Sequence, residues 1–349
     1  MPTPHAPFTE FLRGGIVESV HAGSVAVVDR DGRLLYGAGS PEFVTFTRSS
    51  LKPLQALPFV AAGGLDRFRF TQAETALLCA SHSGEPRHVE AAASMLSKAG
   101  NDAGDLQCGT HPPMWYETHG EIPPQPPYSP LAHNCSGKHS GMLAHCVACA
   151  YGRHDYLELE HPLQREIRAA VAHMTGTHEP DLIPGIDGCS APNYALPLAR
   201  LAFAFARLAA PGADPVYGEA PRRLADAMTA CPEMVSGEGR IDLALTCAGR
   251  GDWVCKVGAE GVQAIGVRSR GIGIALKVAD GSRRGLHPAT VATLDQLGLL
   301  DADARRALAP WAVPALRNFR GLPTGEGRAV LVLDKINRPL GGVRDGTGQ

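Results

Sequence analysis

The segments of this chain that favour β-strands lie near its two ends, and the segments that favour helices lie between them. Short β-branched and apolar runs with turn signals occur within residues 14–37, and three more follow at 253–258, 262–269 and 272–279. Helix-type spacing of apolar residues fills the interior from about residue 49 to about 245. A chain with this order can form one sheet only by joining distant segments, so we expect a helical lobe inserted into a sheet built from both ends.

Length and composition agree with a layered α/β fold. The 349 residues, of which 44% are hydrophobic, can bury a sizeable core in one large domain or two modest ones. Because no clear linker or internal repeat interrupts the chain, we expect a single domain over residues 1–349. Its sheet should come from 14–47 and 250–335, and its helical lobe should span about 49–245. Residues 341–349 are expected to fray.

Several helix boundaries are marked by capping residues and prolines. Thr71 to Glu74 has the form of a capping box, which predicts a helix ending near Cys79. Pro86 at a first helical position predicts another helix. The run at 192–210 is apolar nearly all round, which predicts a buried central helix. The remaining predicted helices span about 49–62, 86–99, 137–151, 161–176, 219–231 and 287–299.

Two further strand signals and one unusual segment complete the prediction. Asp31-Gly32 predicts a hairpin turn, and residues 329–334 predict a last strand. Residues 112–130 contain seven prolines, and we expect no regular structure there. The segment fits either a stiff surface connection or a flap over a pocket, because long loops in compact domains often carry function.

Charge and hydropathy exclude several classes of protein. The net charge is −2 and neither sign dominates any stretch, which argues against binding to nucleic acid or to a membrane surface. No run approaches the roughly 18 uninterrupted apolar residues of a membrane-spanning helix, and the first ten residues lack the features of a signal peptide. Nine cysteines, an odd count, then favour reduced thiols and a cytoplasmic location.

Lysine is rare in this chain, and two of its six lysines follow a nucleophile-type side chain by three residues. Ser49 precedes Lys52, and Cys135 precedes Lys138, with a spacing that places both members of each pair on one helix face. A neutral lysine can take a proton from serine, which requires the lysine pKa to fall from about 10.4 towards 7 through burial or a nearby cation. The spacing alone fits a helix-start serine and an exposed lysine equally well.

Two other positions also fit either a structural or a functional role. Ser81 lies in the small, polar stretch from Cys79 to Glu85, which fits either a helix-ending turn or a proton relay in a pocket. Lys256 ends a predicted strand just before glycines, where a lysine either meets solvent or places its charge in a pocket.

Two cysteines occupy positions that suit a metal. Cys135 belongs to the densest polar stretch of the chain, at the start of a predicted helix, where a thiol pKa is lowered and the thiolate is favoured. Cys189 follows a glycine turn of the same kind. Two such thiolates, with Lys138 or a histidine, could hold Zn²⁺ and leave a position for water, although two cysteines so far apart usually form no metal site. The Cys146 and Cys149 pair lies in an apolar helical run and is interpreted as packing.

Five motifs taken together resemble one known family, the rhizobial-type or class 3 L-asparaginases. The similarity covers about residues 12–335, and five motifs in the family's order are far more specific than any one of them. The motifs are Arg48-Ser49-Ser50-Leu51-Lys52-Pro53-Leu54-Gln55, Cys79-Ala80-Ser81-His82-Ser83-Gly84-Glu85, Asn134-Cys135-Ser136-Gly137-Lys138-His139-Ser140-Gly141, Asp187-Gly188-Cys189-Ser190-Ala191-Pro192 and Lys256-Val257-Gly258-Ala259-Glu260-Gly261.

The resemblance implies a fold like that of serine β-lactamases and penicillin-binding enzymes, with an antiparallel sheet flanked by helices and an inserted helical lobe. It implies a homodimer and two catalytic Ser–Lys pairs, Ser49 with Lys52 and Ser81 with Lys256. Val257 departs from the β-lactamase pattern, in which Ser or Thr follows the strand lysine. Binding of β-lactam carboxylates is therefore not expected.

The same resemblance implies residues for the metal. Zn²⁺ would be held by Cys135, Lys138 and Cys189, with water completing the site. As a further hypothesis, we expect Arg48, Asp187 and His139 to bind substrate, with Asp187 facing its α-ammonium group.

These features lead to one hypothesis and two alternatives. We expect an L-asparaginase that converts L-asparagine to L-aspartate and ammonia, with zinc in a supporting role. A glutaminase or another amidohydrolase on the same scaffold is the first alternative, since one methylene changes binding by only about 1–3 kcal/mol. A zinc-storing or redox-sensing protein without catalysis is the second, but it leaves both Ser–Lys pairs unexplained.

Overall fold

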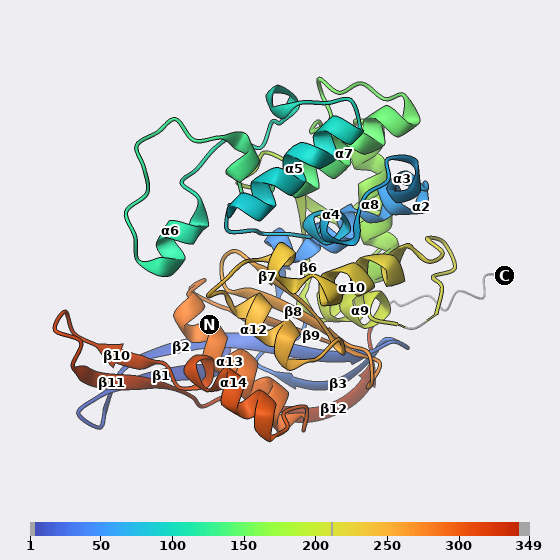
Figure 1. Cartoon of the computed structure of the whole chain (residues 1–349). Helices are drawn as coiled ribbons and strands as arrows, with labels where there is room; N and C mark the ends of the chain where they lie inside the picture. Colours follow the sequence, from blue (N-terminus) through green and yellow to red (C-terminus); the bar gives the residue numbers. More distant parts are fainter. Residues whose placement is uncertain (1–3, 211, 342–349) are drawn as a thin grey trace.

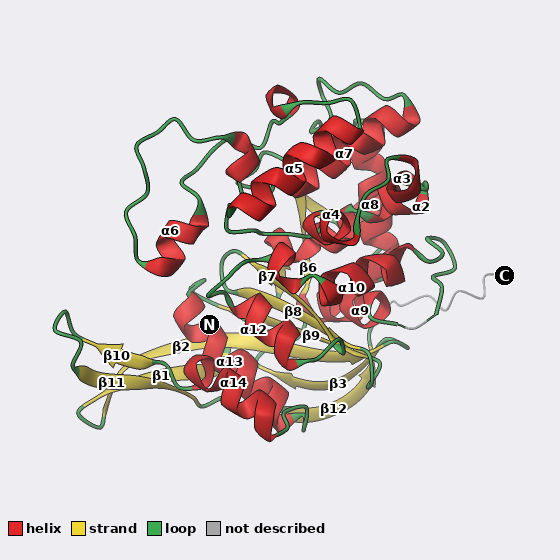
Figure 2. Cartoon of the chain, in the orientation of Figure 1, coloured by secondary structure: helices red, strands yellow, loops and turns green. Residues whose placement is uncertain are grey.

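The computed structural model describes residues 4–210 and 212–341, which form a sheet layer and a cluster of helices (Figure 1). In this view the large sheet lies in the lower half and most helices lie above it, while α12, α13 and α14 lie in front of the sheet (Figure 2). The predicted mixed α/β class, with a large antiparallel sheet and helices, is confirmed.

Within the described residues the large sheet has nine strands, all in antiparallel pairs. Seven follow one path, in the order β10 (Ala315–Arg317), β11 (Pro323–Ala329), β1 (Ala6–Arg13), β2 (Ile16–Asp29), β9 (Ile272–Val278), β8 (Val262–Val267) and β7 (Trp253–Gly258). The other two are β3 (Arg33–Ala38), which pairs with β2, and β12 (Asp334–Pro339), which pairs with β3.

β2 is the strand that connects the parts of this sheet. Its first half pairs with β1, and its second half lies between β9 and β3. Along that second half the side chains alternate, with Ala26 and Val28 in one apolar cluster and Val25 and Val27 in the other. Both faces of the sheet centre are therefore covered, as the two-residue period of a strand requires.

On one face, α9 (Leu198–Leu208) packs directly on β2, β8 and β9. Gly266 and Gly273 are paired across β8 and β9, and a Cβ on either would collide with α9 backbone, at the Phe205 and Ala202 carbonyls respectively. The two glycines therefore set how closely the helix approaches the sheet. The opposite face is covered by α12 (Ile241–Ala248), α13 (Arg283–Gln296) and α14 (Ala302–Ala312).

The upper part combines short helices with a small second sheet. That sheet has the order β4 (Val44–Phe46), β6 (Pro192–Pro197) and β5 (Ile183–Ile186). The helices are α1 (Lys52–Gln55), α2 (Leu57–Ala61), α3 (Gly64–Arg67), α4 (Gln72–Leu77), α5 (Pro86–Lys98), α6 (Met114–His119), α7 (Ser136–Cys149), α8 (Pro162–Thr175), α10 (Ala220–Ala230) and α11 (Pro232–Val235). Single 3₁₀ turns lie at Arg48–Leu51, Ala103–Asp105, Pro130–Ala132 and Glu179–Asp181.

Two local predictions are confirmed. Thr71 and Glu74 form a complete capping box at the start of α4, with reciprocal side chain to backbone hydrogen bonds. Gly32 has φ +77° in the turn between β2 and β3, as the Asp31-Gly32 hairpin signal requires.

The predicted helix at 192–210 is wrong in its first part. Residues 192–197 form β6, held between β4 and β5, and only α9 is helical. Pro197 caps the start of the helix in an extended conformation. An apolar run buried on all sides has no period that separates a strand from a helix, and the pairing partners decide it.

The predicted strand at 329–334 is also wrong, because it falls between β11 and β12. The apolar character there reflects Leu331, which is buried, while the backbone N–H groups of Val330 and Leu331 donate to Phe8 O. The neighbouring strands, β11 and β12, are polar and show no apolar alternation, so the sequence pattern missed them. β1 was missed for a similar reason, since Pro7 within it is typical of a break.

Two further expectations need correction. The helix expected over 49–62 is divided into a 3₁₀ turn, α1 and α2, and Pro53 and Pro58 each stand near the start of a short segment. Residues 112–130 contain regular structure after all: α6 begins after Pro113 and ends at Gly120, which has φ +68°. The fraying expected over 341–349 concerns residues that, apart from Gly341, lie outside the described ones.

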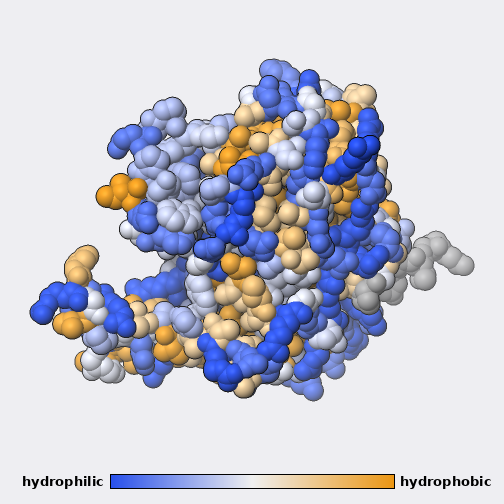
Figure 3. Space-filling view, viewed as in Figure 1, coloured by the Kyte–Doolittle hydropathy of each residue, from blue (hydrophilic) through white to orange (hydrophobic). Residues whose placement is uncertain are grey.

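None of the described helices is long and apolar enough to cross a membrane. On the face shown in Figure 3, polar side chains predominate, and the surface is hollowed between the α6 segment and the arm formed by β10 and β11.

Candidate active site

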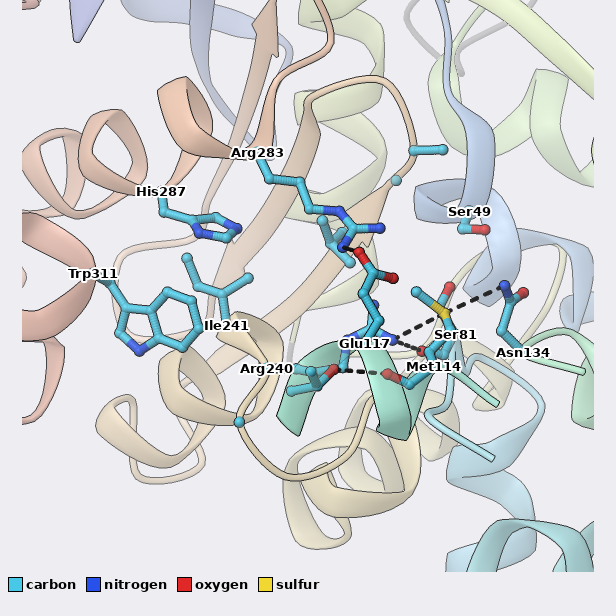
Figure 4. A pocket seen from close by; sticks show the side chains of 15 residues that line it. Ser49, Ser81, Met114, Glu117, Asn134, Arg240, Ile241, Arg283, His287 and Trp311 are labelled. Carbon is cyan, nitrogen blue, oxygen red and sulfur yellow. Dashed lines mark hydrogen bonds and ion pairs between the residues drawn. The ribbon is translucent and has the colours of Figure 1, made fainter. Parts of the chain in front are cut away.

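A cavity of about 310 Å³ brings together residues from distant parts of the chain. Ser49 and Ser81 open onto it together with Asn134, and the end of β7 forms another wall. α6, α13 and α14 close the remaining sides (Figure 4). Two of the five motifs thus contribute a serine to one cavity, although 32 positions separate them in the sequence.

Ser81 lies between the two buried lysines of the predicted pairs. Its Oγ is 3.0 Å from Lys52 Nζ and 2.8 Å from Lys256 Nζ. Ser81 is 5% exposed, Lys52 1% and Lys256 0%, so this contact is shielded from water. Its backbone is fixed as well, because its N–H donates to Val235 O at 2.9 Å and its carbonyl accepts from Arg240 Nη1 at 3.0 Å.

The environment of Lys256 favours its neutral form. Burial lowers the pKa of this amine from 10.5 to about 7, the Asp242 carboxylate opposes that change, and the charges of Lys52 and Arg240 add to it. The amine also donates to Val257 O at 2.7 Å and lies 3.8 Å from Asp242 Oδ2. A lysine poised near neutral pH beside a serine hydroxyl is suited to accepting and returning a proton.

Asp242 is a residue that sequence reasoning missed. Its two carboxylate oxygens accept from Val257 N at 2.8 Å and from Gln263 Nε2 at 3.0 Å, and it is 1% exposed. The signal available was a single carboxylate in the apolar run of α12, where an unpaired charge would be costly.

Ser49 stands at the cavity wall in a different setting. It is only partly buried, and it follows Arg48, whose φ of +50° is unusual for a residue other than glycine. Asn193 holds that conformation with two bonds to Arg48, accepting from its N–H and donating to its carbonyl, both at 3.0 Å. The chain thus turns sharply before Ser49, and the following 3₁₀ turn leads into α1.

The structure does not join Ser49 to Lys52 by a hydrogen bond in the residues it describes. Lys52 Nζ instead bonds to Ser81 Oγ, to Ala80 O and, at 3.3 Å, to Asn134 O. The amine lies one helical turn from Ser49 in the chain but is turned towards the buried serine. Catalytic hydrogen bonds are often long without substrate, and the Ser49–Lys52 pair stays a prediction.

The residues expected to bind substrate lie apart from the cavity wall. Arg48 Nε donates to Asp187 Oδ1 at 2.9 Å, so the two form an ion pair. His139 is fully buried, with Nδ1 2.7 Å from the Tyr156 hydroxyl. Neither the pair nor His139 lines the 310 Å³ cavity.

Two of the three residues of the zinc hypothesis are in direct contact, and the third, Cys135, lies nearby. Lys138 Nζ donates to Cys189 Sγ at 2.9 Å, and all three residues are buried. The neighbouring Cys135 side chain and the Lys138 charge lower the pKa of Cys189. The neighbouring Cys189 side chain and burial raise the pKa of Cys135, whose thiol donates to Asn134 Oδ1 at 2.8 Å. Burial alone would lower the pKa of Lys138, but the two sulfurs outweigh it and raise it.

The donor set at this position suits zinc. It offers two sulfurs and an amine, and the buried Nε2 of His139, which has no hydrogen-bond partner among the described residues, is close by. No group of three or more His, Cys, Asp or Glu side chains in residues 4–210 and 212–341 could hold a metal. A metal here would therefore need the lysine as its third protein ligand.

Comparison with known proteins gives the family. The sequence model for L-asparaginase II matches residues 9–329. The chain belongs to the L-asparaginase II family, which confirms the family predicted from the five motifs. No curated protein matches the sequence.

Solved structures of Mglu resemble this chain more remotely. The native form in 4.3 M NaCl shares 19% identity over 81% of this chain and 63% of the other, with a TM-score of 0.36. A second native form shares 18% identity over 81% of this chain and 66% of the other, also with a TM-score of 0.36. This chain thus spans less than two thirds of the length of these Mglu structures.

Proposed function

We propose that this protein hydrolyses L-asparagine to L-aspartate and ammonia. The observation that carries the proposal is the buried Lys52–Ser81–Lys256 cluster beside a cavity that Ser49 also lines. Membership of the L-asparaginase II family supports the same reaction. The β-lactamase-like fold, the homodimer and the cytoplasmic location expected from the sequence stay predictions.

In this scheme Ser49 is the nucleophile and Ser81 is a proton relay. A nucleophile must reach the substrate, and Ser49 is partly exposed at the cavity, whereas Ser81 is 5% exposed and held by two amines. Ser49 Oγ attacks the side-chain carboxamide carbon, and the C–N bond of the resulting intermediate breaks to release ammonia. Water then cleaves the ester of Ser49, which restores the hydroxyl and releases L-aspartate.

The two lysines share the proton that these steps move. With a pKa of about 7, Lys256 is near half neutral at neutral pH, so the cluster can lack one proton. A proton can then pass from Lys52 through the Ser81 hydroxyl to Lys256. This transfer leaves Lys52 neutral, one helical turn from Ser49. Lys52 then takes the serine proton, and Ser81 and Lys256 deliver it to the departing ammonia.

The developing oxyanion can be stabilised by backbone N–H groups. The N–H of Ser49 lies in the first turn of a helix, where backbone donors lack partners within the helix. A second donor can come from the cavity wall after β7, at Gly258 and Ala259.

Zinc is proposed as a supporting ion held by Cys135, Lys138 and Cys189. Bound there, it would supply positive charge that lowers nearby pKa values and orients the substrate. The Arg48–Asp187 pair and His139 are proposed to complete the substrate site, with Asp187 available for an ammonium group.

An ammonia-release assay tests the proposal. L-asparagine should be hydrolysed faster than L-glutamine, and Ser49→Ala should retain less than a few per cent of the wild-type rate. Ser97→Ala, at an exposed position of α5, is the control and should retain full activity. Faster turnover of glutamine would favour the glutaminase alternative. Tight zinc binding without ammonia release would favour the non-catalytic one.

A further inference from the structure

Arg240 is a partly buried cation at the cavity that forms no ion pair with any carboxylate among the described residues. Its Nη1 donates to Ser81 O at 3.0 Å and contacts Met114 Sδ at 3.3 Å. Within the described residues these are the hydrogen bonds of its side chain, which takes part in no ion pair. Burial lowers the pKa of this guanidinium, and the nearby Asp242 carboxylate opposes that change.

The acidic groups around Arg240 have other partners. Asp242 binds the Val257 N–H and the Gln263 amide, and it lies 3.8 Å from Lys256. Glu117 pairs with Arg283 at 3.2 Å, and both side chains are more than half exposed. In Figure 4 this pair stands between His287 and Ser49, while Arg240 lies beside Met114 and Ser81.

A guanidinium has five N–H donors arranged as a planar fork that matches a carboxylate. Only one nitrogen of Arg240 is engaged, and its other nitrogens are not among the fully buried polar atoms that lack a partner. They therefore retain exposure, and Arg240 lines the cavity. A partly buried guanidinium without a paired carboxylate can gain bonds from an anionic ligand that enters the cavity.

We propose that Arg240 binds the α-carboxylate of the amino-acid substrate. The inference rests on the proposed function and adds its substrate class: carboxamides that carry a free carboxylate next to the reacting side chain. Because Arg240 bonds to the Ser81 backbone, this anchor is fixed relative to the catalytic cluster. The proposed contact between Arg240 and the carboxylate requires no metal.

The test compares two substrates that differ only at the α-carboxylate. L-asparagine has the charge, and its α-methylamide keeps the side-chain carboxamide but is neutral there. Wild-type enzyme should show kcat/KM at least about 30-fold lower for the methylamide, because charge-assisted bonds to a carboxylate are lost. Arg240→Gln should lose about 10- to 100-fold on asparagine and less than about 3-fold on the methylamide.

The ratio of kcat/KM for L-asparagine to kcat/KM for its α-methylamide cancels any effect of a substitution that is the same for both substrates. Arg240 also influences the Lys256 pKa, but that influence applies equally to either substrate. Arg240→Lys should fall between the wild type and Arg240→Gln, since it keeps the charge without the fork. Arg305→Gln removes an exposed arginine that pairs with Asp295 and should behave as wild type. Thermal unfolding of each variant shows whether it is folded.

Calorimetric binding of L-aspartate gives a second readout that needs no turnover. Arg240→Gln should bind it at least about tenfold more weakly than wild type. Equal hydrolysis of both substrates by wild type would overturn the assignment, as would a discrimination ratio that survives in Arg240→Gln. If no carboxamide is hydrolysed, the proposed function is wrong. Unchanged L-aspartate binding in Arg240→Gln would independently contradict the Arg240 assignment.

Discussion

Replacing Lys256 with methionine should change how the stability of this protein depends on pH. The lysine is 0% exposed, and burial lowers its pKa from 10.5 to about 7. Between these two values the unfolded chain binds the proton and the folded chain does not, so the free energy of unfolding rises with pH. Below about pH 7 both states carry the proton, and the folded state bears the full cost of a buried ammonium.

The size of the effect follows from the width of the pH interval between the folded-state pKa of about 7 and the ordinary value of 10.5. A comparison between about pH 6.5 and about pH 9.5 covers about 2.5 pH units of it, which at about 1.4 kcal/mol per unit gives roughly 3 kcal/mol. The unfolding free energy of wild type, minus that of Lys256→Met, should therefore rise by about this amount across the interval. The double difference cancels groups common to both proteins, including buried cysteines that titrate when the chain unfolds.

Urea-induced unfolding, followed by tryptophan fluorescence at both pH values, measures this difference. Lys335→Met removes an exposed lysine of β12 and should show no comparable pH dependence against wild type. The loss of the Ser81 and Val257 contacts lowers stability in Lys256→Met by a similar amount at both pH values. A double difference that stays flat, or that falls as the pH rises, would refute the lowered pKa and with it the proton-accepting role of Lys256.

Three shorter predictions concern the surroundings of the cluster. Asp242→Asn should shift the acid limb of the pH profile of kcat/KM, expected near pH 7 in wild type, to lower pH by roughly one to three units. The reason is that charges about 4 Å apart interact by about 4 kcal/mol at a dielectric constant of 20. An unshifted limb would show that this carboxylate does not act on Lys256. Asn193→Ala should lower the free energy of unfolding by about 1–3 kcal/mol and reduce kcat, since it removes both hydrogen bonds that hold Arg48 at positive φ. An unchanged kcat would show that this turn does not contribute to catalysis. Cys189→Ser should abolish stoichiometric zinc measured by elemental analysis, and chelation of wild type should leave measurable ammonia release; complete loss of turnover with intact secondary structure would contradict the supporting role of zinc.

The family resemblance allowed the serine and lysine positions of the site to be anticipated. Ser81 and Lys256 were paired from sequence and lie 2.8 Å apart, although 175 positions separate them. The family motifs, rather than spacing or composition, supplied that pairing. The capping box at Thr71 and the glycine turn at Gly32 were accessible because each depends on residues within one turn of chain.

Other features depend on the tertiary environment and could not be read from local pattern. Arg240 and Asp242 sit beside an ordinary helix start, and only the fold shows that one faces a cavity and the other faces Lys256. The change from strand to helix at Pro197 depends on the neighbours of β6, and the polar strands β11 and β12 lack an apolar face that a pattern could detect. The spacing of Ser49 and Lys52 predicted one shared helix face, yet the buried lysine amine bonds to Ser81 instead.

The most direct test of the account is the identity of the serine that carries the acyl group. A reaction with L-asparagine, quenched by acid within the first turnover and digested for mass spectrometry, should show the aspartyl ester on the peptide that contains Ser49. Because Ser81 is the serine in contact with both lysine amines, it is the natural competitor. An ester found on Ser81, or the same ester yield from Ser49→Ala as from wild type, would contradict the assignment of Ser49 as nucleophile.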